Sequence, residues 1–161
     1  MNTKTLSIAA LALALTAAAG EASAQQQTVT FSIDPINEMS VSGNPGALTI
    51  NAATAGSAPT SVSDASTTWG ITTNQTGTKV TAAIDQAMPA NVTLRVNLAA
   101  PTGATSAGAV ALGTSGVDVV TGITKLSESG KVITYTLSAT AAADVVANAS
   151  RTVTYTVVAG S

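Results

Sequence analysis

The sequence predicts an all-β protein, built as a single antiparallel β-sandwich domain, and three observations support this prediction. Near the C-terminus, residues 151–158 alternate Val or Tyr with Thr, which places apolar and polar side chains on opposite faces of a strand. Related stretches occur at residues 28–33 and 131–137. Turn-forming residues separate such stretches at intervals of roughly 8–12 residues, as in known sandwiches. A closed barrel is the alternative fold.

Residues 1–24 have the features of an export signal. Lys4 precedes a short apolar run at residues 6–19, and Ala22-Ser23-Ala24 has the small-x-small form that signal peptidase cleaves. We therefore expect a mature chain of residues 25–161 that is secreted or extracellular, free or held non-covalently at a cell surface, and not inserted into a membrane. An uncleaved anchor is the alternative, but the apolar run is shorter than the ~20 residues that a spanning helix needs.

Charged residues are scarce in this chain. They make up 9% of it, against about 25% in an ordinary globular protein, so Thr, Ser, Asn and Gln must form most of the polar surface. The net charge is −2 and there is no basic run, which argues against nucleic acid and anionic membranes as partners. Such a surface suits either a bland secreted domain or a subunit that packs against copies of itself. Without cysteine, the domain must be held together by its core or by another chain.

The first half of the mature chain contains most of the predicted strands. Residues 28–33 form the first, with Val29, Phe31 and Ile33 on one face, and Asp34-Pro35 ends it because proline has no N–H group to donate. Turn chemistry at residues 74–77, with alternation on both flanks, predicts a β-hairpin. The other strands predicted here are residues 36–41, 47–51 with Leu48 and Ile50 inward, a short edge strand at 61–63, and the two hairpin strands 69–73 and 79–85.

The second half repeats this pattern with one exception. Residues 91–98 alternate four apolar and four polar positions, short strands follow at 109–112 and 117–123, and a turn at 127–130 leads into a strand at 131–138. The exception is the alanine-rich stretch 139–149, which we expect to cross one end of the sandwich with Val145 and Val146 against the core. A turn or two of helix is the alternative there, since alanine favours helix. Residues 151–158 close the domain.

The sequence contains no recognisable catalytic or cofactor-binding constellation. It has no His and no Cys, which removes the commonest general base, thiol nucleophiles and the usual zinc ligands. A glycosidase would need two carboxylates across a cleft, and four aromatic residues are too few to line one. We therefore predict that the protein is not an enzyme, with no catalytic, cofactor or metal residues. The mature-chain carboxylates are Asp34, Glu38, Asp64, Asp85, Asp118, Glu128 and Asp144.

Two features of the sequence, an acidic turn and the single tryptophan, also have a binding interpretation. Asp34 and Glu38 bracket a proline-containing turn and could hold calcium, but the spacing of a calcium loop is missing and a solvated acidic turn is the preferred interpretation. Trp69 could stack on a glycan. Its alternation with Ile71 favours a core position instead.

Thr28-Val-Thr-Phe31 at the mature N-terminus and Thr152-Val-Thr-Tyr-Thr-Val157 near the C-terminus, with the export signal and small neutral side chains, resemble bacterial surface-fibre subunits. The resemblance to these pilin-like families implies an immunoglobulin-like sandwich that donates an N-terminal strand to a neighbouring copy. The C-terminal strand also looks like the end of WxL-type cell-surface domains. The chain lacks the disulfide of the best-known pilins, which argues against a chaperone–usher export route.

We therefore expect a structural subunit of an extracellular filament or surface assembly, whose partners are copies of itself. An exposed edge of neutral β-formers invites strand pairing, and few Lys or Glu are available here to prevent it. The predicted donor strand lies within residues 25–33 and comprises Thr28, Val29, Thr30, Phe31 and Ile33. The predicted acceptor edge comprises Val153, Tyr155 and Val157. The alternatives are a monomeric secreted or periplasmic binding module, which would keep residues 28–33 in its own sheet, and an enzyme that uses the carboxylates.

Overall fold

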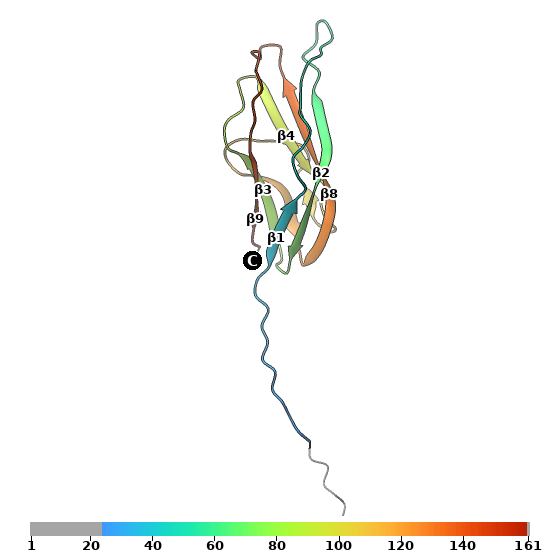
Figure 1. Cartoon of the computed structure of the whole chain (residues 1–161), viewed down its shortest axis with the longest axis vertical. Helices are drawn as coiled ribbons and strands as arrows, with labels where there is room; N and C mark the ends of the chain where they lie inside the picture. Colours follow the sequence, from blue (N-terminus) through green and yellow to red (C-terminus); the bar gives the residue numbers. More distant parts are fainter. Residues whose placement is uncertain (1–23, 161) are drawn as a thin grey trace, which may run out of the picture. The chain divides into compact units, whose positions relative to one another are not determined.

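The computed structural model describes residues 24–160 and has two antiparallel sheets packed as a β-sandwich, with no helix in that range (Figure 1). This confirms the predicted fold class, while the immunoglobulin-like topology stays a prediction. The compact unit begins at Ile33, and the predicted export signal lies outside the described residues except for Ala24. One sheet has the order β1-β2-β8-β4-β6 and the other β5-β7-β3-β9. The strands are β1 (Asn37–Val41), β2 (Val62–Thr73), β3 (Thr78–Ile84), β4 (Val92–Leu98), β5 (Thr105–Ser106), β6 (Val110–Ala111), β7 (Val117–Ile123), β8 (Leu126–Ala139) and β9 (Val153–Val158).

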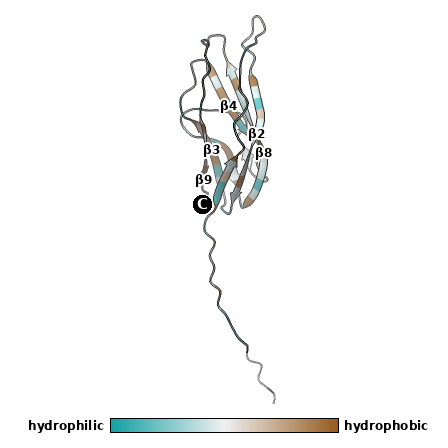
Figure 2. Cartoon of the chain, in the orientation of Figure 1, coloured by the Kyte–Doolittle hydropathy of each residue, from teal (hydrophilic) through white to brown (hydrophobic). Residues whose placement is uncertain are grey.

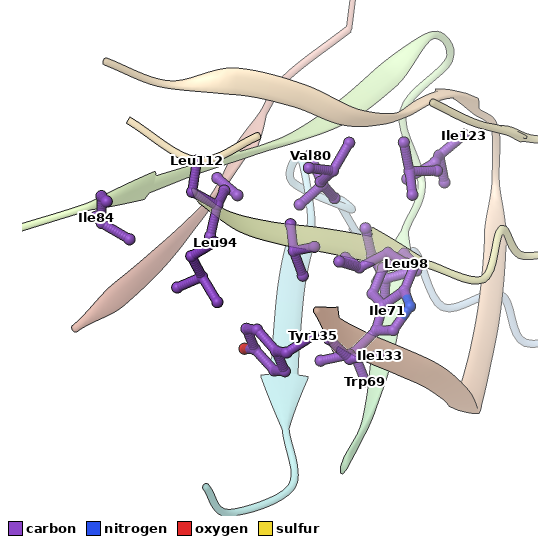
Figure 3. Packing of buried hydrophobic residues seen from close by; sticks show 14 residues of the cluster. Trp69, Ile71, Val80, Ile84, Leu94, Leu98, Leu112, Ile123, Ile133 and Tyr135 are labelled. Atoms are coloured by element: carbon purple, nitrogen blue, oxygen red, sulfur yellow. The ribbon is translucent and has the colours of Figure 1, made fainter. Parts of the chain in front are cut away.

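The core forms where the alternating apolar side chains of the two sheets meet. In β3, for example, Val80, Ala82 and Ile84 are buried while the residues between them are only partly covered. Figure 2 shows the resulting bands of hydrophobic and hydrophilic residues along the strands. Trp69 is 2% exposed and its Nε1 donates to the Ala99 carbonyl oxygen at 3.2 Å, which confirms the predicted core position (Figure 3).

The predicted hairpin around residues 74–77 is wrong. β2 pairs with β1 and β8, and β3 pairs with β7 and β9, so the turn carries the chain from one sheet to the other. Turn residues specify that the chain reverses, but they do not specify that the flanking strands exchange hydrogen bonds. The predicted turn at residues 127–130 likewise lies inside β8, where Gly130 has a φ of +70° and the ladder to β2 shifts register.

Two other predicted strands are not strands. Within the part of the chain that the structure describes, residues 28–33 and 47–51 have no ladder partner, although Leu48 is half-buried and packs against the core. The prediction for the 139–149 connection was right in lacking helix and wrong about its valines, since Val145 is 101% exposed and Val146 46%. The connection is held instead by Asn91, whose carbonyl oxygen accepts from Thr140 N at 3.0 Å and whose Nδ2 donates to the Ala142 carbonyl oxygen at 3.1 Å.

Candidate functional site: an open seam between two edge strands

The two sheets leave a gap on the side where β1 and β9 lie. β1 is the last strand of one sheet and β9 the last strand of the other, and the two lie beside each other (Figure 1). A cavity of about 170 Å³ opens between them. We call this region the β1/β9 seam, and its lining residues are Met39, Ser40, Val41, Val153 and Tyr155.

The hydrogen-bond register of β9 shows which of its backbone groups face the open side. Asp85 N donates to the Thr152 carbonyl oxygen at 3.1 Å, so this residue pair is a hydrogen-bonded pair of the β3–β9 ladder. Antiparallel ladders alternate between hydrogen-bonded and non-hydrogen-bonded pairs. The even-numbered residues of β9 therefore bond to β3. Val153, Tyr155 and Val157, the predicted acceptor residues, direct their N–H and C=O groups to the free edge.

The same argument applies to β1 at the other side of the seam. Asn74 N donates to the Ile36 carbonyl oxygen at 3.2 Å, and Ser42 N donates to the Thr68 carbonyl oxygen at 2.8 Å. These bonds bracket β1, so its even-numbered residues bond to β2. Asn37, Met39 and Val41 therefore direct their backbone polar groups away from β2. Sequence reasoning did not find this second free edge, because the alternation of residues 36–41 identifies a strand and not its place in a sheet.

The residues with free backbone groups also direct their side chains toward the sandwich interior. Met39, Val153, Tyr155 and Val157 pack against the core but are only half-buried, and Val41 is 49% exposed. The seam thus combines incompletely covered apolar side chains with N–H and C=O groups that have no ladder partner among residues 24–160. An additional β-strand would satisfy both.

A pair of tyrosines joins the two sheets beneath the seam. The hydroxyls of Tyr135 on β8 and Tyr155 on β9 are 2.8 Å apart. Burial raises the pKa of both phenols above their usual value of 10.0. The pair therefore ties β9 to the other sheet, and its burial favours the protonated phenols.

This pair predicts a loss of stability in alkali. Because the folded-state pKa values are raised, their stabilising effect is complete below pH 10 and is lost as the pH rises above it. We expect the free energy of unfolding to decline above about pH 10, and less steeply in Tyr155→Phe. Urea unfolding of both proteins between pH 8 and 11 measures this. Equal slopes for the two proteins would contradict it.

The predicted donor residues lie in a segment without regular structure. No strand occurs between residues 24 and 36, and Thr28 and Thr30 are exposed. The alternating apolar side chains are more unusual, since Val29 is 78% exposed, Phe31 86% and Ile33 78%. Large apolar side chains exposed in regular alternation are costly in water and are typical of a segment that binds elsewhere.

Two of the acidic residues line the same hollow. A second hollow of about 320 Å³ contains Glu38 and Glu128, but Glu128 is bound by Lys131 Nζ at 2.6 Å and by Thr102 N at 3.1 Å. These bonds lower the pKa of Glu128 from 4.5 to about 2. Within residues 24–160, no three acidic side chains come together as a metal site would require.

Comparison with protein-family models, curated proteins and solved structures gave no match to this chain. Over the described residues, no helix has the length and apolar character that crossing a membrane would take. The function is therefore inferred from the β1/β9 seam and from the segment that precedes β1.

Proposed function

We propose that the protein is a non-enzymatic structural subunit of an extracellular filament or surface assembly. Copies join head to tail when residues 28–33 of one copy pair with the free edge of β9 in the next. Export through residues 1–24 and residence at a cell surface belong to this proposal. The observation that carries it is the match between an exposed, alternating strand sequence and an edge with free backbone groups.

The spacing of the two segments supports this pairing. Val29, Phe31 and Ile33 follow one another at intervals of two residues, and so do Val153, Tyr155 and Val157. Directly opposed residues in a ladder share a face, so the donor's apolar side chains would enter the seam while its backbone bonds to β9. Each buried large apolar side chain contributes roughly 1.5–3 kcal/mol, part of which offsets the ordering of the donor strand.

The charge distribution is also suitable. Residues 25–33 contain no charged side chain, and neither do the five residues that line the seam. Pairing therefore removes no charged side chain from water. Desolvation of charges is a large cost when an interface is buried, and it is absent here. The same neutrality leaves β9 without the lysines that usually protect an exposed edge.

Removing residues 25–33 tests this function. We expect the full mature chain to form multimers and the truncated chain to be a folded monomer with the same circular dichroism spectrum. Size-exclusion chromatography with light scattering, together with negative-stain microscopy, measures both. Truncated multimers of unchanged size would rule out strand donation, and a monomeric full-length protein would favour the alternative of a secreted binding module.

A further inference from the structure

The three residues between the donor segment and β1 are tied to the turn at residues 74–77. Asn74 Nδ2 donates to the Asp34 carbonyl oxygen at 2.8 Å, and Asn74 Oδ1 accepts from Ile36 N at 2.8 Å. The backbone N–H of Asn74 donates to the Ile36 carbonyl oxygen at 3.2 Å. One residue thus binds both ends of the Asp34–Ile36 linker.

Neighbouring groups fix this arrangement further. Gln75 Nε2 donates to Asn74 Oδ1 at 2.7 Å, which orients the amide. Pro35 has a fixed φ and keeps Asp34 out of helical geometry, so the linker is stiff as well as tied. The linker is therefore extended where it meets β1.

This restraint limits where the donor segment can bind. To pair with the seam of its own copy, the chain would have to reverse direction before β1, and the tightest strand reversal uses two residues. Because residues 34–36 are held by Asn74, the reversal would fall within residues 28–33 and would remove Ile33 from the pairing segment. A neighbouring copy can receive all six residues without any reversal.

We propose that Asn74 is a positioning residue. It prevents the donor segment from pairing with the seam of its own copy, so that the segment pairs with a second copy of the chain. This inference rests on the proposed strand donation and adds the choice of partner. The linker and Asn74 do not contact the partner themselves. They restrict the direction and the reach of residues 28–33, which make that contact.

Two variants of the full mature chain test this inference. Asn74→Ala removes the two side-chain bonds to the linker, along with the bond from Gln75, and insertion of Gly-Ser-Gly-Ser between Ile33 and Asp34 keeps all three but adds slack. We expect both to lower the ratio of multimer to monomer at least about tenfold. In Asn74→Ala this is the effect of losing two hydrogen bonds of ordinary net strength, and in the insertion variant it follows because the added slack lets the donor segment reach the seam of its own copy. In the monomers, the amides of Phe31 and Tyr155 should be protected from hydrogen exchange.

Ser42→Ala is the matched control. The Ser42 Oγ accepts from Thr68 N at 2.8 Å and ties the other end of β1 to β2, so its loss tests whether loosening β1 is sufficient. We expect this variant to assemble like the parent chain.

The outcomes separate this inference from the proposed function. Multimers that persist in both linker variants, and yet are dissolved by deleting residues 25–33, would overturn the role of Asn74 and leave strand donation standing. Multimers that survive the deletion would overturn both. If Asn74→Ala does not fold, the insertion variant decides alone, because it keeps every contact of the sandwich.

Discussion

Phe31→Asp is expected to convert the multimers into monomers and to leave the sandwich itself unchanged. The Phe31 side chain is 86% exposed, so its replacement removes no core contact. In the assembly, the variant loses the burial of a phenylalanine, worth roughly 1.5–3 kcal/mol, and places a carboxylate in an apolar seam at further cost. At about 1.4 kcal/mol per factor of ten, we expect association to weaken at least about 100-fold. Light scattering across a dilution series measures this.

Thr30→Asp is the control for the added charge. It has the same net charge as Phe31→Asp, but the alternation of residues 28–33 directs residue 30 away from the seam and into water. We expect this variant to assemble within a few-fold of the parent chain. An equal loss of association in the two variants would show that the added charge near the N-terminus weakens assembly, whichever way the side chain of residue 31 points. Unchanged assembly in Phe31→Asp would exclude Phe31 from the contact.

The sandwich could be predicted from sequence because its evidence is local. The alternation in β3, β4 and β9 reports which side chains face a core, and the structure buries Val80 and Val96 as that alternation requires. The core position of Trp69 followed from the same rule. These predictions needed no knowledge of which strand lies beside which.

The errors arose where strand order decides the outcome. Residues 28–33 have the composition of a strand, but a strand also needs a neighbour for its N–H and C=O groups, and the structure provides none there. The turn at residues 74–77 was correct as a reversal and wrong as a hairpin for the same reason. Val145 and Val146 were placed in the core by hydrophobicity alone.

The candidate site could be predicted only in part. The predicted acceptor residues Val153, Tyr155 and Val157 were chosen for their pattern, and β9, which contains them, is the edge strand of its sheet; their acceptor role stays a prediction. The opposite side of the seam, formed by Met39 and Val41, depends on β1 and β9 ending different sheets on the same side. Nothing in a single sequence encodes that long-range relation.

Disulfide trapping can locate the donor strand because the chain has no cysteine of its own. Phe31→Cys in one copy is mixed with Val153→Cys, Tyr155→Cys or Val157→Cys in another copy of different mass. Strand pairing would bring one of these pairs close to the Cβ separation of about 3.5–4.5 Å that a disulfide requires. Because each protein carries a single cysteine, every mixed product joins two copies. Val145→Cys, at a side chain that is 101% exposed, reports random collision.

This mixing experiment tests the central claim most directly. Strand donation predicts that, under mild oxidation, at least one β9 cysteine joins Cys-substituted residue 31 of the other copy at least about tenfold faster than the Val145→Cys control, a preference worth roughly 1.4 kcal/mol. The claim would be contradicted if the mixed disulfide formed no faster at any of the three β9 positions than it does with Val145→Cys.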